Sequence, residues 1–213
     1  EEKRMDQIGN ETNVQFIGGS SADNMAFKNT EIYADGKMYN RATLLALIKP
    51  ARSFEILKSQ SMKVLDKEMT VDKTKNNGRL VNRMNKKSAV KAYAEALGIS
   101  EKDVPNYVIS NPIGIVIDKQ PYVRSILRLH GKSIEFAAAV LEGMTVNLLQ
   151  TGNIVNDTRR DVKKMMKNIG NASGLIMFNC AYRKIELAQQ NKTNAFARIF
   201  KDIPMIGCDS FGE

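Results

Sequence analysis

Apolar and polar residues alternate over short distances in the first part of the chain, which predicts strands and tight turns. The segment 31–39 alternates on both sides of Asp35 and Gly36, a dipeptide that supplies the positive φ angles of a two-residue hairpin turn. The unbroken apolar run at 42–48 predicts a buried strand. Further strands are predicted at 14–17, which leads into a small polar loop, at 53–61, and at 68–84, which turns at Asn77 and Gly78.

Two segments have the spacing of amphipathic helices. Residues 87–97 place apolar side chains on one face and end at Gly98, where a left-handed residue is expected. Residues 153–170 carry basic side chains on one face, and the opposite face consists of Val155, Thr158, Val162, Met165, Met166 and Ile169. Between these helices, a largely antiparallel group of strands is predicted from four apolar runs at 107–110, 113–118, 122–129 and 133–140.

The C-terminal part alternates between strand and helix. An apolar strand at 173–178 is followed by a loop at 179–183, a helix at about 186–201 and a short strand at 204–207. A strand, a helix and a second strand in this order predict parallel pairing through a crossover. The predicted fold class is therefore α/β of the mixed α+β kind: a mixed sheet with antiparallel hairpins and a C-terminal parallel βαβ unit, with helices packed on the sheet.

The charge of the chain does not change this picture. The formal net charge is +9, and basic residues drive non-specific binding to nucleic acid. The basic clusters at 73–83 and 159–167 contain no aromatic side chains that would stack on bases, so we interpret them as solvated surfaces. No apolar run approaches the ~20 residues of a membrane helix. We therefore predict neither nucleic acid nor membrane as a partner of this segment.

The cysteine, histidine and glycine residues indicate whether the chain binds a metal or a cofactor. Two cysteines without a pairing pattern favour a reducing compartment. The only histidine, His130, has no metal-ligating residue at a typical spacing, and the glycine-rich loop at 17–24 lacks nucleotide-binding fingerprints. We therefore predict no metal and no cofactor. The polar start without an initiator methionine and the abrupt end suggest that the chain is a piece of a longer protein.

Cys180 and Arg183 are the strongest candidates for a functional role. They follow the strand at 173–178, at the carboxyl end where open α/β sheets bind ligands. A guanidinium group there binds a carboxylate through two hydrogen bonds and lowers the pKa of a nearby thiol. Alternatively, Cys180 is a small buried filler and Arg183 lies on a helix surface. Arg124, within an apolar strand, either faces solvent or pairs with a carboxylate, because an unpaired buried arginine is costly.

A short sequence pattern is repeated near the two ends of the chain. Both FIGGSSADN and MIGCDSFGE contain the pattern Ile-Gly-x-x-Ser, where a strand is predicted to run into a small polar loop. This repetition suggests a duplicated half-domain. The matching residues are Ile17, Gly18 and Ser21 in the first copy and Ile206, Gly207 and Ser210 in the second.

Several segments in a fixed order point to a known family. They are GGSSADN, EIYADGKMYNRATLLAL, NPIGIVI, PYVRSILRL, GMTVNLLQTGNIVNDTRR, LIMFNCAYRK and IGCDSFGE. In this order they resemble the FIST family of sensory domains, named after F-box and intracellular signal transduction proteins. The resemblance covers nearly the whole chain, with 1–49 as the end of an N-terminal FIST half and 54–213 as a FIST C-terminal domain.

The resemblance implies a cytoplasmic, small-ligand-binding sensory module of a bacterial signalling protein, joined to a signalling output domain or a partner protein. It implies an amino acid or a related carboxylate as the ligand. For such a sensory module we predict no catalytic residue. The family's cysteine and arginine fall on Cys180 and Arg183. From the predicted strand-end positions together with the resemblance, the ligand-binding residues expected are Ser20, Ser21, Asp23, Asn24, Arg124, Asn179, Cys180, Arg183, Ser210 and Glu213.

An enzyme stays open as the alternative to a sensory module at this point. An enzyme would use Cys180 as a nucleophile, activated by Arg183 or by a base such as His130 brought close by the fold. In either case, unpaired strand edges in an isolated half-domain favour a homodimer that covers them.

Overall fold

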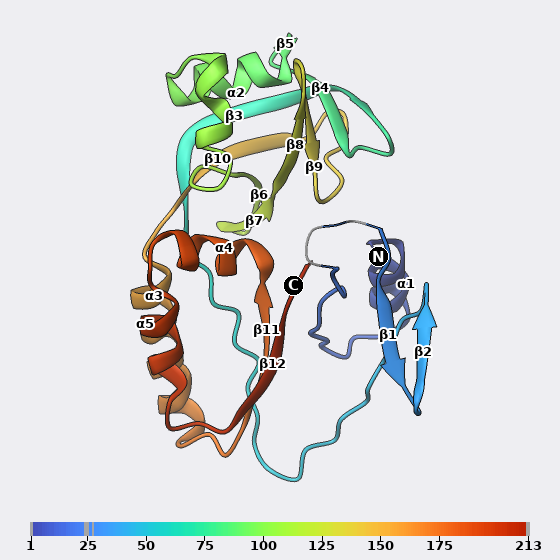
Figure 1. The fold of residues 1–213 in the computed structure, drawn as a ribbon, viewed down its shortest axis with the longest axis vertical. Coiled ribbons are helices and arrows are strands. Elements are labelled where there is room, and N and C mark those ends of the chain that lie inside the picture. Colours follow the sequence, from blue (N-terminus) through green and yellow to red (C-terminus); the bar gives the residue numbers. More distant parts are fainter. Residues whose placement is uncertain (1, 24–25, 27, 212–213) are drawn as a thin grey trace. The chain divides into compact units, whose positions relative to one another are not determined.

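The computed structural model describes residues 2–23, 26 and 28–211. Contacts divide the chain into two compact units (Figure 1). Unit 1 consists of Glu1–Ser59 and Thr158–Glu213, and unit 2 consists of Gln60–Asp157. The domain boundary that the sequence suggests between residues 49 and 54 stays a prediction.

Unit 2 is built on an eight-stranded sheet in which each pairing is antiparallel. The strand order is β7-β6-β10-β3-β4-β9-β8, and β5 pairs with β4. The predicted antiparallel character of this part is therefore confirmed. The strands are β3 (Met62–Lys75), β4 (Leu80–Met84), β5 (Lys87–Ser88), β6 (Ile113–Ile117), β7 (Gln120–Arg124), β8 (Ile126–His130), β9 (Ser133–Phe136) and β10 (Thr145–Thr151).

The sheet of unit 2 is strongly bent. Strands β7 and β8 stand at opposite ends of the strand order, although only Ser125 separates them in the chain. The sheet must therefore curve until the ends of its outermost strands meet at this residue. The apolar run at 122–129 is divided between these two strands. The predicted turn between β3 and β4 is confirmed, because Asn77 has a φ of 54° and Gly78 a φ of 82°.

Strand β10 was not predicted from the sequence, and neither was α1 (Glu2–Glu11). Strand β10 lies in the middle of the sheet, between β3 and β6, and Val146, Leu148 and Leu149 on it are at most 1% exposed. A register shift between Asn147 and Leu149 interrupts the alternation of its side chains. The irregular pattern that results gives no clear strand signal in the sequence.

Helix α2 (Ala89–Leu97) contacts β3, β4 and β9 and closes the core of unit 2 (Figure 1). It ends at Gly98, whose φ of 72° confirms the predicted left-handed residue. The short 3-10 helix η1 (Glu101–Asn106) follows. Tyr93 of α2 is fully buried, and its hydroxyl donates a hydrogen bond to the Asn111 carbonyl oxygen at 2.7 Å.

Unit 1 combines a hairpin, a parallel strand pair and several helices. The predicted parallel pairing is confirmed for β11 and β12, and Asp35 and Gly36 both have positive φ in the predicted hairpin turn of β1 and β2. Together with unit 2, this gives the mixed α+β fold expected from the sequence. The elements are α1 (Glu2–Glu11), β1 (Glu31–Ala34), β2 (Lys37–Asn40), most of α3 (Ile154–Ile169), β11 (Leu175–Cys180), α4 (Ala181–Gln189), α5 (Thr193–Ala197), η2 (Arg198–Phe200) and β12 (Met205–Ser210).

The helices of the C-terminal part differ in detail from the prediction. The apolar face of α3 is confirmed by Val155, Val162 and Met165, each at most 7% exposed. The loop predicted at 179–183 is wrong, because β11 continues to Cys180 and α4 begins at the next residue. The predicted single helix at 186–201 is divided into α4, α5 and η2, and Asn191 has a φ of 54° at the interruption.

Four of the predicted strands do not form. The segments 14–17, 42–48, 53–61 and 107–110 contain no strand. In the apolar run at 42–48, Leu44 is 59% exposed and Leu47 is 91% exposed, so the prediction of a buried strand is wrong. An apolar run becomes a buried strand only where neighbouring strands pair with it, and none of the described strands pairs with this run.

Candidate functional site

The parallel strands β11 and β12 bring several of the predicted site residues together. In their register, Asn179 lies beside Asp209 and Cys180 lies beside Ser210. Helix α4 begins directly after Cys180, so its N-terminal end lies at the carboxyl end of the strand pair (Figure 1). The carboxyl end of parallel strands, next to a helix N-terminus, is a common place for ligands to bind.

The loop that contains Ser20 reaches the same end of the strand pair. The backbone of Ser20 forms two hydrogen bonds with that of Phe211, with N–O distances of 2.6 and 3.2 Å. Next to it, a Cβ atom at Gly19 would lie 2.6 Å from Ser210 Cβ, so only glycine fits there. The two segments that share the Ile-Gly-x-x-Ser pattern therefore meet at this point. Ser210 is 2% exposed, whereas Ser21 is exposed.

Asp23 orders its own loop. Its carboxylate accepts hydrogen bonds from the backbone amides of Lys28 and Asn29, at 2.7 and 3.1 Å. The other two polar residues expected at this end of the site, Asn24 and Glu213, lie outside the described residues.

Arg183 connects three segments of unit 1. Its guanidinium group donates to the Ser59 carbonyl oxygen and to Thr158 Oγ1, both at 2.8 Å, and lies 5.7 Å from the ring centroid of Phe196. The Ser59 hydroxyl in turn donates to Asp161 Oδ2 at 2.9 Å. We call Ser59, Thr158, Asp161, Arg183 and Phe196 the arginine cluster. Arg183 thus fixes the first turn of α4 against α3 and the segment before β3.

The partners of Arg183 were not predicted from the sequence, although the sequence contains one indication of them. Thr158 is the only polar residue on the predicted apolar face of α3 and is 3% exposed. A buried hydroxyl requires a hydrogen-bond partner, so a polar residue on an apolar face indicates a polar group on the neighbouring element. Ser59 and Phe196 gave no comparable signal.

Asn179 and Lys184 both bind Asp209. The Asn179 amide donates to Asp209 Oδ1 at 2.8 Å, and Lys184 Nζ lies 2.9 Å from Asp209 Oδ2. Partial burial raises the pKa of Asp209, but the hydrogen bonds from Asn179 and Lys184 and the charge of Lys184 outweigh it, so the pKa lies below its usual value. Asp209 is therefore ionised over the physiological range.

Cys180 is half-buried and lies close to Tyr182. Burial raises the pKa of Tyr182, and negative charge on Cys180 raises it further. Tyr182 is consequently a neutral hydrogen-bonding group at physiological pH. The second cysteine, Cys208, is exposed on β12.

Arg124 belongs to unit 2, whereas the other described residues of the predicted site belong to unit 1. It stands at the end of β7, and its guanidinium group donates to the carbonyl oxygens of Ala139 and Val123, both at 3.3 Å. His130 also belongs to unit 2, where its imidazole lies 2.6 Å from the Glu135 carboxylate.

Two family models match the chain. The FIST C domain matches residues 89–213, and the FIST N domain matches residues 1–87. The chain belongs to the FIST family. FIST domains are sensory domains of signal transduction. The site at the ends of β11 and β12 therefore lies in a sensory domain. No curated protein and no solved structure matches the chain.

None of the described helices has both the length and the apolar character that a membrane crossing requires. Residues 2–23, 26 and 28–211 contain no group of three or more His, Cys, Asp or Glu side chains placed to hold a metal ion.

Proposed function

We propose that unit 1 is the ligand-binding part of this FIST protein, and that it binds a small carboxylate, such as an amino acid, at the carboxyl ends of β11 and β12. One observation carries the proposal: the register of the two strands sets Cys180 beside Ser210 at the beginning of α4. The first amides of a helix lack acceptors within the helix and attract anions. A carboxylate there receives hydrogen bonds from these amides and from the Ser210 hydroxyl.

The remaining residues of the proposed site have two kinds of role. Ser20 and Ser21 supply hydroxyl groups from the loop that joins β12 at Phe211. Arg183 holds the first turn of α4 in place, since its guanidinium group bonds to Ser59 and Thr158, and contributes positive charge to the same turn. The ammonium group of an amino acid has three N–H donors and needs an acceptor, for which we propose Asp23.

The rest of the proposal rests on the family. We place the protein in the cytoplasm of a bacterium, where binding shifts the population of conformations and is passed to an output domain or a partner protein. A second copy of the chain is one such partner. Exposed apolar side chains on the strand pair, such as Ile176 at 53% and Ile206 at 73%, support an interface on unit 1.

The enzymatic alternative has less support. It needs a group that activates Cys180, and the arginine expected to do so donates its hydrogen bonds to Ser59 and Thr158. We therefore do not propose a catalytic role for Cys180.

Thermal unfolding with the common amino acids and small carboxylates tests the proposal. A ligand at ~100 times its Kd stabilises the folded state by about 2.7 kcal/mol, which is readily measured. We expect at least one carboxylate to stabilise the wild-type chain, and Cys180→Ser and Ser210→Ala to reduce this effect. Cys208→Ser is the matched control, because it changes the other cysteine of the same strand pair, and it should retain the effect.

The proposal is wrong if no carboxylate stabilises the chain, or if Ser210→Ala and Cys208→Ser respond equally to the ligand. Circular dichroism of each variant separates a lost binding site from a lost fold, because an unfolded variant also loses its helical signal.

A further inference from the structure

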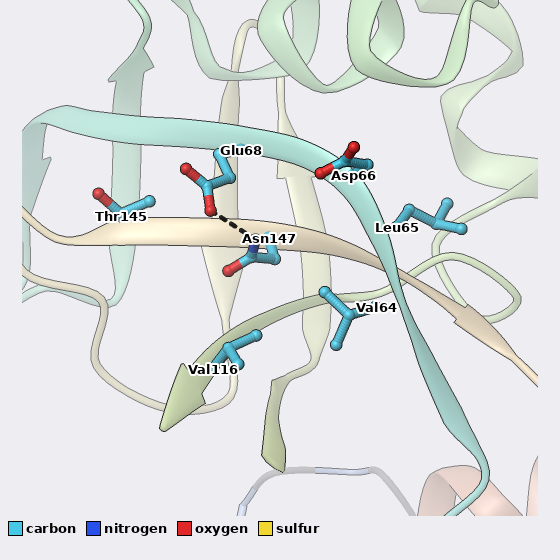
Figure 2. A pocket seen from close by; sticks show the side chains of 7 residues that line it. All are labelled: Val64, Leu65, Asp66, Glu68, Val116, Thr145 and Asn147. Carbon is cyan, nitrogen blue, oxygen red and sulfur yellow. Dashed lines mark hydrogen bonds between the residues drawn. The ribbon is translucent and has the colours of Figure 1, made fainter. Parts of the chain in front are cut away.

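An open pocket lies on the sheet of unit 2, with a cavity volume of about 620 Å³. It is formed by side chains from three strands, β3, β6 and β10 (Figure 2). None of the residues considered for the carboxylate site takes part in it. The lining residues are Val64, Leu65, Asp66, Glu68, Val116, Thr145 and Asn147.

The pocket is negatively charged in a chain with a net charge of +9. Asp66 and Glu68 are two residues apart on β3 and so share one face of the strand. No lysine or arginine lines the pocket. Among the residues that the structure describes, no cation forms an ion pair with either carboxylate. The pocket therefore offers two negative charges to a ligand.

Asn147 lies beside the carboxylates and carries a further polar group. Asn147 is 8% exposed and lies opposite Glu68 in the strand register. Its amide nitrogen donates to Glu68 Oε1 at 3.3 Å, and its amide oxygen points away from Glu68 (Figure 2). This oxygen accepts no hydrogen bond from the described part of the chain. Asn147 Oδ1 is not one of the buried side-chain atoms without a partner, so it is open to the pocket and can accept a hydrogen bond from water or from a ligand.

The other side of the pocket is apolar. Val64, which is 42% exposed, and Val116 present aliphatic side chains close to the polar groups (Figure 2). A ligand that matches both sides has a group with several N–H donors and a positive charge, attached to a short hydrocarbon chain.

We propose that this pocket binds a primary amine cation with a short aliphatic chain and no carboxylate. The ammonium group donates to Glu68 and Asp66, and the hydrocarbon chain packs on Val64 and Val116. A carboxylate on the ligand is unfavourable, because it meets Asp66 and Glu68. This site is independent of the carboxylate site proposed in unit 1 and takes the opposite charge.

Isothermal titration calorimetry of the whole chain with pentylamine tests the proposal at neutral pH. Pentanol, which lacks the charge, and aminovalerate, which adds a carboxylate, are the ligand controls. We expect pentylamine to bind more tightly than both. Asp66→Asn and Glu68→Gln should each weaken its binding by about tenfold or more, which corresponds to about 1.4 kcal/mol. Glu101→Gln removes the same charge from the exposed start of η1 and should leave binding unchanged.

Four outcomes overturn the proposal. The first two are that pentylamine does not bind, or that pentanol binds as tightly as pentylamine. The third is that Glu101→Gln weakens pentylamine binding as much as Glu68→Gln does. The fourth is that Ca²⁺ displaces pentylamine and binds more tightly. Both pocket variants replace exposed side chains by others of nearly equal size. A thermal unfolding curve of each variant shows whether the fold is kept.

Discussion

The two units of this protein bury their apolar residues to very different extents. In unit 2, the side chains of Tyr93, Phe136 and Leu148 are at most 1% exposed. In unit 1, Leu47 is 91% exposed and Ile206 is 73% exposed. Unit 2 therefore has the core of an ordinary folded domain, whereas unit 1 presents much of its apolar surface outward.

The difference follows from how the strands are connected. In unit 2, the hairpins β3–β4, β6–β7 and β8–β9 are joined into one sheet by the long-range pairings of β10 with β3 and β6 and of β4 with β9, and α2 packs on this sheet. In unit 1, β11 and β12 form a two-stranded parallel pair, a type of sheet that is normally covered on both faces. Specific polar contacts, such as those of Arg183, and close approaches, such as that of Gly19 to Ser210, hold unit 1 together. A unit of this kind gains more from a ligand or a partner than a unit with a complete core.

The largest expected effect comes from the core of unit 2. Phe136→Ala removes a side chain that is 1% exposed and leaves a cavity, so the free energy of unfolding of unit 2 should fall by about 3–5 kcal/mol. Leu47→Ala in unit 1 removes an exposed side chain and should change stability by less than about 0.5 kcal/mol. Urea denaturation of both variants measures the contrast, and similar losses would show that Leu47 is covered in solution.

Arg183→Met should give the next largest effect. The change removes the hydrogen bonds to the partly buried Ser59 and to the buried Thr158, so unit 1 should lose about 2–3 kcal/mol. Arg198→Met is the control, because Arg198 is an exposed arginine of the same unit. Hydrogen exchange of α3 and α4 amides reports on unit 1 alone, and equal exchange in the two variants would contradict a stabilising arginine cluster.

Gly19→Ala tests the contact between the two related segments of unit 1. The added methyl group overlaps Ser210, which should cost about 1–3 kcal/mol unless the loop moves. Gly18→Ala is the neighbouring control, because a Cβ atom there meets nothing within 4 Å. If thermal unfolding shows both variants to be equally stable, Gly19 and Ser210 do not lie together in solution.

Tyr93→Phe should have the smallest effect, a loss of about 1 kcal/mol from the missing hydrogen bond to Asn111. The variant also changes the response to alkali. Burial raises the pKa of Tyr93, so its contribution to stability is complete below the unfolded pKa of about 10 and is lost as the pH rises above it. Stability measured from neutral pH into alkali should therefore decline less in Tyr93→Phe, and parallel curves would argue against a buried hydroxyl.

Local signals in the sequence predicted the elements that depend on local chemistry. Gly98 marks the end of α2, and Asp35 and Gly36 mark the turn of the first hairpin, because positive φ angles favour few residue types. The amphipathic face of α3 was also predicted correctly, since its 3.6-residue spacing is preserved over the whole helix.

Elements that depend on distant partners were not predicted. The run at 42–48 has the composition of a buried strand but no strand beside it, and β10 is central because β3 and β6 flank it. The candidate site shows the same limit. The position of Cys180 and Arg183 at a strand end followed from local spacing, whereas the bond from Arg183 to Ser59 joins residues 124 positions apart.

Hydrogen exchange of the wild-type chain, with and without a mixture of the common amino acids, tests the central claim most directly. If unit 1 binds a carboxylate at the ends of β11 and β12, amides at 180–184 and 19–21 exchange more slowly with the mixture present. The amides of α2 and β10 in unit 2 then exchange at the same rate in both samples. Unchanged exchange at 180–184, or protection confined to unit 2, would contradict the assignment of the ligand site to unit 1.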